Sequence, residues 1–222
     1  MATSTHRISR FGFVNAYLVR EDDGLTLIDT MIPGSSKAIL AAAQDLGAPI
    51  VRIALTHAHG DHIGSLDALA AQLPDAEVII SERDAALMAG DKSLRDGEPG
   101  KLKGSYPGAK TTPGRTVNGG DRIGSLEVVP APGHTPGHVA FRDTRDNTLY
   151  CGDAFSTLGG MATSAKPNWR FPLPAMATWH RPTELESARA LRALDPSALA
   201  PGHGKVVEGP GAAMDRAIAA AA

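Results

Sequence analysis

The chain has 222 residues, of which 42% are hydrophobic and 21% are charged. This balance is typical of a globular protein and excludes a disordered or fibrous one. The formal net charge of −2 excludes the strongly basic surface on which nucleic-acid binding depends. We expect a single domain over residues 1–222, because an α/β domain of this length needs no division.

Two features bear on where the protein works. The N-terminal stretch MATSTHRISRFGFVNAYLV has no apolar segment after its charges, and no run of about 18 apolar residues occurs in the chain. The single cysteine, Cys151, excludes an internal disulfide and suits a reducing compartment. We therefore expect a cytoplasmic protein that contacts neither membrane nor nucleic acid and acts on a small molecule.

The first half of the chain alternates strand and helix patterns. Residues 11–19 and 25–28 predict neighbouring strands, joined through REDDG, whose Asp-Gly pair favours a hairpin. Residues 35–47 predict a helix with serine at its start and Gly47 past its end. Further patterns predict a strand at 50–55, a helix at 63–73, a strand at 77–80 and a helix at 81–90.

The second half repeats this order. Strands are predicted at 121–129, 138–142 and 148–151, and TELE at 183–186 predicts a capping box that starts a final helix. The repetition indicates an α/β fold with two similar β-rich halves, each covered by helices. Two long irregular segments, 91–115 and 155–182, interrupt the pattern, and loops of that length are commonly functional.

The stretch LTHAHGDHIGSL, residues 55–66, follows a predicted buried strand and gathers four metal-binding side chains. His57 and His59 are two apart in extended chain and project the same way, and Asp61 and His62 follow at the turn into a helix. One tetrahedral zinc cannot take so many ligands from so short a segment. The cluster therefore predicts two metal ions.

Further ligands occur where later apolar runs end beside glycine. These are His134 in PGHTPGH, Asp153 in YCGDA and His203 in APGHG. Only three of the eight histidines, His6, His138 and His180, lie outside these positions. A single histidine is more often structural, but this joint pattern favours metal binding.

The motifs THAHGDH, GHTPGH, GDA and PGHG, preceded by LIDT, resemble those of the metallo-β-lactamase-fold hydrolase superfamily, and the resemblance covers nearly the whole chain. It implies an αββα sandwich with a binuclear site at one edge. It also implies that His57, His59 and His134 hold one metal, that Asp61, His62 and His203 hold the other, and that Asp153 bridges both. Asp29 of LIDT would orient a ligand through its second ring nitrogen, and His138 would line the site or support a ligand.

Such a site predicts a hydrolase. Two divalent metals lower the pKa of water, so that a metal-bound hydroxide can attack a carbonyl or phosphoryl centre near neutral pH. We expect zinc, with iron or manganese as alternatives, because histidine and aspartate suit all three. Asp61 is the expected catalytic residue, which orients the nucleophile or carries its proton.

Differences from known branches of the superfamily reduce the number of expected substrate classes. Metallo-β-lactamases generally lack an aspartate at position 153, and this chain is too short to include the C-terminal glutathione-binding region of glyoxalase II. Quorum-quenching lactonases carry a tyrosine where this chain has Ser156, which argues against lactonase activity without excluding it. RNA-processing relatives need a basic RNA-binding arm, and this near-neutral chain offers no clear one. We expect a small carboxylic ester, thioester or lactone as the substrate.

Three alternatives stay open at this stage. The protein could hydrolyse β-lactams, or it could be a mononuclear iron enzyme like the persulfide dioxygenases, which use the positions of His57, His134 and Asp153. The third alternative is a noncatalytic metal-stabilised binding domain, which would lose stability rather than turnover on chelation.

The segment 155–182 is the expected substrate wall. A mostly apolar pocket with a few directed polar groups suits a small ester or lactone. Its candidate apolar and polar contacts are Met161, Trp169, Phe171, Met176, Trp179, Lys166, Arg170 and His180.

Overall fold

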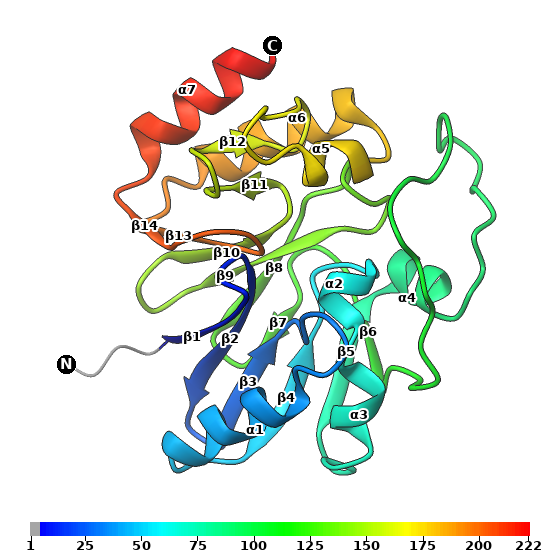
Figure 1. Ribbon diagram of the computed structural model, residues 1–222, viewed down its shortest axis with the longest axis vertical. Coiled ribbons are helices and arrows are strands. Elements are labelled where there is room, and N and C mark those ends of the chain that lie inside the picture. The colour runs from blue at the N-terminus through cyan, green and yellow to red at the C-terminus, as the bar shows by residue number, and fades with distance from the viewer. Residues whose placement is uncertain (1–4) are drawn as a thin grey trace. The chain divides into compact units, whose positions relative to one another are not determined.

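The structure is a computed structural model that describes residues 5–222 and separates into two compact units. The first unit extends to Asp91 and includes Tyr106–Val117, and the second comprises Lys92–Ser105 and Asn118–Ala222. Each unit contains one six-stranded sheet, and the second unit adds a two-stranded one (Figure 1). Two β-rich halves with helices are therefore present, as the sequence predicted.

In the first unit the strand order is β1-β2-β3-β4-β5-β6. Pairing is antiparallel from β1 to β3 and parallel from β3 to β6. The elements of this unit are β1 (Thr5–Arg10), β2 (Val14–Glu21), β3 (Gly24–Ile28), α1 (Ser36–Asp45), β4 (Ile50–Ala54), α2 (Gly60–Ile63), α3 (Leu66–Ala70), β5 (Glu77–Ser81), α4 (Glu82–Met88) and β6 (Arg115–Val117).

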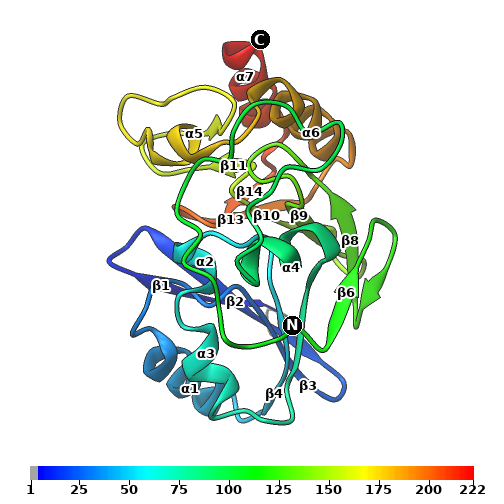
Figure 2. The ribbon, with the colours of Figure 1, turned by 90° about the vertical axis from the view of Figure 1, so that its right-hand side faces the viewer.

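The parallel pairing of β3 with β4 brings together the residues that follow these two strands. All five residues of β3 are buried, as expected of a strand with both faces covered. Figure 2 shows α1 and α3 beside each other, and the two helices are in contact. Because β3 and β4 run parallel and pair Ile28 with Ala54, the residues that follow these two strands emerge side by side.

In the second unit the strand order is β14-β13-β10-β9-β8-β7, and β10 with β13 is the parallel pair. Buried residues of α6 and α7 pack on the sheet, among them Leu191 and Met214 against Leu149 and Leu199. The elements are β7 (Arg122–Ile123), β8 (Leu126–Pro130), β9 (Val139–Asp143), β10 (Thr148–Gly152), β11 (Phe155–Ser156), β12 (Ala162–Thr163), α5 (Leu173–Ala177), α6 (Arg181–Ala193), β13 (Ala198–Pro201), β14 (Val207–Glu208) and α7 (Gly211–Ala221).

Two predicted elements of the first unit were wrong in detail. The strand expected over 11–19 begins at Val14, because Phe11 and Gly12 have positive φ angles of 52° and 76° and form the turn of a hairpin with β1. The helix expected over 63–73 is interrupted after α2. There the Ser65 hydroxyl donates to Ile32 O at 2.7 Å and accepts from Ser35 N–H at 2.8 Å, which ties the break between α2 and α3 to the chain before α1.

The second unit required three further corrections. The strand expected over 121–129 is the hairpin β7–β8, because Gly124 with φ 58° turns the chain. The helix expected from Thr183 begins at Arg181 after His180, so the capping box does not form. The segment 155–182 contains β11, β12 and α5, and α7 follows the helix that was expected to be last.

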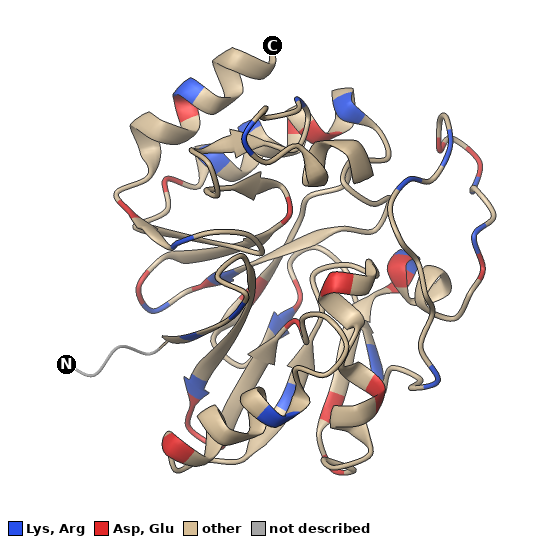
Figure 3. Ribbon diagram, viewed as in Figure 1, with Lys and Arg blue, Asp and Glu red and all other residues tan. Residues whose placement is uncertain are grey.

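The long connection between α4 and β6 contains no helix or strand, as predicted. Figure 3 shows both basic and acidic residues along this connection. Residues 91–98 mix the two charges, whereas the charged residues from 99 to 114 are Lys101, Lys103 and Lys110. Among residues 5–222 no helix combines the length and the apolarity that crossing a bilayer requires.

Candidate metal-binding site

The first unit presents four predicted ligands directly after β4. His57 and His62 are fully buried, His59 is nearly so, and Asp61 lies half-buried in the first turn of α2. The ring centroids of His57 and His62 are 4.1 Å apart, and those of His57 and His59 are 4.9 Å apart. The ligand atoms of His57 and His59 lie within 4.8 Å of each other, as do those of Asp61 and His62. One short stretch therefore concentrates four donors.

Asp29, predicted to orient a ligand, lies against this cluster. It follows β3 with a φ of 59°, a left-handed conformation that aspartate tolerates better than most residues. Its Oδ2 lies 2.8 Å from His62 Nδ1, and its Oδ1 accepts the Thr56 N–H at 2.8 Å. A carboxylate facing an imidazole nitrogen accepts a hydrogen bond from its N–H group. His62 therefore carries its hydrogen on Nδ1, and its Nε2 carries none.

Thr56 extends this control to His57. Its hydroxyl lies 2.8 Å from Asp29 Oδ2 and 3.0 Å from His57 Nδ1. Because its one hydrogen goes to the carboxylate, its lone pair must face His57, which places a proton on Nδ1 there too. One aspartate therefore sets the tautomers of two predicted ligands, and both Nε2 atoms become available to a cation.

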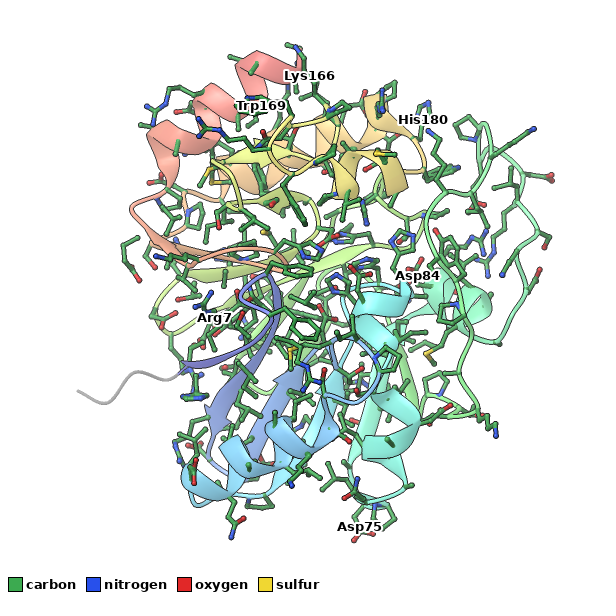
Figure 4. All side chains as sticks on the ribbon, in the orientation of Figure 1. Arg7, Asp75, Asp84, Lys166, Trp169 and His180 are labelled. Atoms are coloured by element: carbon green, nitrogen blue, oxygen red, sulfur yellow. The ribbon has the colours of Figure 1, made fainter. Side chains whose placement is uncertain are left out.

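Two contacts in the first unit were not foreseen. Asp84 of α4, labelled in Figure 4, is fully buried and accepts the N–H of Ala58 at 2.9 Å. This bond fixes the backbone between His57 and His59. The ring of Tyr106 is 4.6 Å from that of His59. Tyr106 is the sole aromatic residue between α4 and β6, which was the available signal for its role.

The second unit presents the other three predicted ligands from separate strand ends. His134 follows β8, Asp153 follows β10 and His203 follows β13. Asp153 Oδ2 lies 3.4 Å from His134 Nε2 and 3.2 Å from His203 Nε2. All three residues are buried. The carboxylate therefore lies between two imidazoles, the arrangement expected of a bridging ligand.

Local contacts hold this group in place. His138 Nε2 accepts the N–H of Asp153 at 3.1 Å, so His138 contacts the backbone of the predicted bridging residue and supports it. His134 Nδ1 lies 3.1 Å from the Thr178 hydroxyl, and its carbonyl accepts the N–H of Trp179 at 2.9 Å. The connection between α5 and α6 therefore holds the His134 loop in place.

Gly133 and Glu184 show how closely α6 approaches the loop before His134. A Cβ on Gly133 would lie 2.3 Å from Glu184 Cα, so only glycine fits. Burial raises the pKa of Glu184 well above its ordinary value. Burial likewise raises the pKa of the Cys151 thiol, and its place in the core of the second unit agrees with a structural role.

The predicted substrate wall divides into buried and exposed parts. Trp179 is 7% exposed, and its indole N–H donates to Pro99 O at 2.8 Å. His180 precedes α6 with its Nδ1 2.8 Å from the Thr183 hydroxyl, and Met161 packs on the core of the second unit. By contrast, the ring of Phe171 lies 5.2 Å from that of His203. Trp169, labelled in Figure 4, is 83% exposed.

The donor chemistry fits divalent metal ions. Asp153 Oδ2 faces His134 Nε2 at 3.4 Å and His203 Nε2 at 3.2 Å, so one buried carboxylate meets two buried imidazoles within the second unit. Buried imidazole nitrogens and carboxylate oxygens are also the ligands that zinc, iron and manganese take. The residues present therefore fit the metal ions that the sequence predicted.

Two mixed sheets with helices, and histidines and aspartates at the strand ends, define an α/β protein equipped to bind metal. The chain belongs to the metallo-beta-lactamase superfamily, whose sequence profile matches residues 9–203. The fold predicted from sequence is thereby confirmed, since solved structures of the same fold match almost the entire chain. One is a beta-lactamase from Chitinophaga pinensis, with a TM-score of 0.68, 22% identity, and coverage of 98% of this chain and 88% of that one.

Other relatives include an uncharacterised protein, a hydrolase and a structure titled as di-iron-bound. The "Uncharacterized protein YobT" of Bacillus subtilis (strain 168) is 51% identical over 207 residues, 92% of this chain and 89% of that protein. A hydroxyacylglutathione hydrolase of Xanthomonas euvesicatoria pv. vesicatoria (strain 85-10) is 30% identical over 64% of this chain, which spans only 46% of that protein. The structure titled TTHA1623 in a di-iron-bound form has a TM-score of 0.67 and 27% identity, over 94% of this chain and 96% of that one.

Proposed function

We propose that the protein is a binuclear metal-dependent hydrolase of a small carboxylic ester, thioester or lactone. The observation that carries the proposal is the orientation of the ligands within each unit. In the first unit Asp29 and Thr56 leave Nε2 of His57 and His62 available, and in the second Asp153 lies between His134 and His203. Superfamily membership and the hydroxyacylglutathione hydrolase relative support the same reaction class.

The proposed ligand assignment is the one that the superfamily resemblance implies. His57, His59 and His134 would hold one ion, Asp61, His62 and His203 the other, and Asp153 both. When bound, two divalent ions lower the pKa of water and polarise the carbonyl under attack. Zinc is the proposed metal, and iron is a measurable alternative because TTHA1623 is titled as a di-iron form.

Asp61 is the proposed catalytic residue. It is the only half-buried member of an otherwise buried ligand set, so its carboxylate can reach both a metal and solvent. There it would orient the attacking water and take up its proton, a role that typically contributes 10²–10⁴-fold to a rate.

Phe171 and its neighbours support an apolar acyl or aryl group on the substrate. Phe171 lies against the proposed ligand His203. Trp169 before it and Leu173 and Met176 after it are 83%, 57% and 61% exposed. Large apolar side chains gathered in one exposed stretch commonly mark a binding surface. The Arg170 guanidinium carbon lies 5.0 Å from the Trp169 ring centroid, which offers a positive charge to a polar substituent.

The deciding experiment measures hydrolysis by the zinc-loaded protein of four compounds: an acyl thioester, a homoserine lactone, an aryl ester and a β-lactam. Bound metal is counted in the same samples. We expect two ions per chain and turnover of one of the first three compounds, lowered about 100-fold or more by Asp61→Asn. Asp75→Asn is the matched control, because Asp75 is exposed (Figure 4). Equal rates for the Asp61 variant and its control would contradict the proposed role of Asp61, and turnover of the β-lactam alone would replace the proposed substrate class.

A further inference from the structure

Thr178 occupies a junction within the second unit. It directly follows α5, is fully buried, and its hydroxyl oxygen lies 2.9 Å from Pro174 O and 2.9 Å from Ser164 O. The same oxygen lies 3.1 Å from His134 Nδ1. One hydroxyl therefore contacts the last turn of α5, the chain after β12 and a proposed metal ligand.

Counting protons assigns the direction of each bond. A threonine hydroxyl has one hydrogen to donate, whereas a carbonyl oxygen can only accept. The hydrogen must therefore go to Pro174 O or Ser164 O, and a lone pair faces His134. The partner of that lone pair must be an N–H group, so His134 carries hydrogen on Nδ1. Its Nε2 is then a bare donor atom, 3.4 Å from Asp153 Oδ2.

We propose that Thr178 is a positioning residue that fixes the tautomer and the ring orientation of His134 for metal binding and ties them to the position of α5. Because α5 carries the exposed Leu173 and Met176, the apolar surface and a metal ligand share one hydroxyl group. The inference rests on the proposed role of His134 as a ligand. It goes beyond the proposed function by assigning a residue that no sequence motif indicated.

The test separates the bond to His134 from the role of Thr178 at the end of α5. Thr178→Val keeps the shape and removes the hydroxyl, and Thr178→Ser restores the hydroxyl. The matched control is Thr163→Val, because Thr163 is also buried in the second unit and its hydroxyl has no hydrogen-bond partner among the described residues. All proteins are full-length, and zinc affinity is measured by competition with a chromophoric chelator.

Loss of a group that supports a metal ligand typically weakens metal binding 10–100-fold. We expect Thr178→Val to weaken one of the two zinc constants by about this factor, while Thr178→Ser stays within about threefold of the wild type and Thr163→Val leaves both constants unchanged. Unchanged zinc constants in Thr178→Val would show a capping role alone and overturn the inference, even if the variant unfolds more easily.

A second measurement needs no variant at the site. Imidazole ¹⁵N chemical shifts of the metal-free wild-type chain report which nitrogen of His134 carries hydrogen. We expect Nδ1–H, and a predominant Nε2–H form would overturn the inference even if Thr178→Val fails to fold. This readout also separates the two hypotheses. Absence of zinc binding would contradict the proposed function, whereas the tautomer tests the hydrogen-bond assignment directly.

Discussion

The two units arrange their ligands by different means. In the first unit four proposed ligands come from one stretch, 57–62, and a single carboxylate, Asp29, contacts His62 directly and His57 through Thr56. In the second unit three proposed ligands come from three separate strand ends, and a neutral hydroxyl, that of Thr178, contacts one histidine. Loss of Asp29 should therefore affect several ligands together, whereas loss of Thr178 should affect one.

The contrast also concerns charge. A buried carboxylate that accepts from His62 Nδ1 raises the basicity of that imidazole and partly balances a bound cation. In the second unit the group that faces His134 Nδ1 is the neutral Thr178 hydroxyl, and Asp153 is the carboxylate placed between the two histidines. Support by a charged residue in one unit and by neutral residues in the other predicts unequal sensitivity to mutation.

The largest effect is expected from Asp29→Ala. It leaves the Thr56 N–H and hydroxyl and His62 Nδ1–H without their buried acceptor, and breaking such a network costs about 3–5 kcal/mol. We also expect zinc affinity to fall about 100-fold. Urea unfolding of the metal-free chain and chelator competition measure the two effects. Asp75→Ala is the control, and wild-type zinc affinity in Asp29→Ala would show that the two units do not differ in this way.

A second, slightly smaller effect compares the buried and the exposed part of the predicted substrate wall. Trp179 is buried and bonded to Pro99 O, whereas Trp169 is 83% exposed. We expect Trp179→Ala to lower the free energy of unfolding by about 3 kcal/mol, as for other buried tryptophans. Trp169→Ala should change it by less than about 0.5 kcal/mol.

Although Trp169→Ala should hardly change the free energy of unfolding, we expect it to change the catalytic constants. Trp169→Ala is expected to raise KM for the substrate found in the hydrolysis panel with little change in kcat, because the ring would contact the ground state and the transition state equally. Equal losses of stability in both variants would contradict the division of the wall into a buried and an exposed part.

The smallest effect concerns Asp67 of the first unit. Burial alone would raise its pKa, but hydrogen bonds from the Thr111 hydroxyl and from the N–H groups of Lys110 and Thr111 lower the pKa below its ordinary 3.8. A lowered pKa contributes stability above the unfolded value, and that stability is lost as the pH falls through the folded value. Because Asp67 is exposed, Asp67→Asn should cost no more than about 1 kcal/mol at pH 7.

The pH dependence tests the cause of that effect. The difference in unfolding free energy between wild type and Asp67→Asn should stay constant from pH 7 to about 4.5 and shrink below pH 3.8, where the unfolded chain takes up the proton first. A difference that persists unchanged to pH 3 would indicate lost packing rather than a lost charge. Urea unfolding across this range measures it.

The sequence by itself determined the ligand types, their order and the two-half organisation. Histidines and aspartates beside glycine at the ends of apolar runs mark strand ends, because the middle of a strand packs in the core and functional side chains commonly follow its last residue. His57, His59, Asp61 and His62 form a local motif, and their grouping follows from covalent spacing alone. The role of Asp29 was likewise predictable from LIDT, and the structure places it against His62.

Only the tertiary structure decided which residues orient the ligands and which aromatic side chains are exposed. Thr178, Asp84 and Tyr106 lie 44, 26 and 47 residues from the ligand or backbone group that each contacts, and no local pattern encodes a partner so distant. Trp169 and Trp179 are both tryptophans of the predicted substrate wall, yet Trp169 is exposed and Trp179 is buried. The physical reason is that hydrogen-bond partners and burial are set by packing between elements distant in sequence, whereas ligand spacing at a strand end is set by the chain itself.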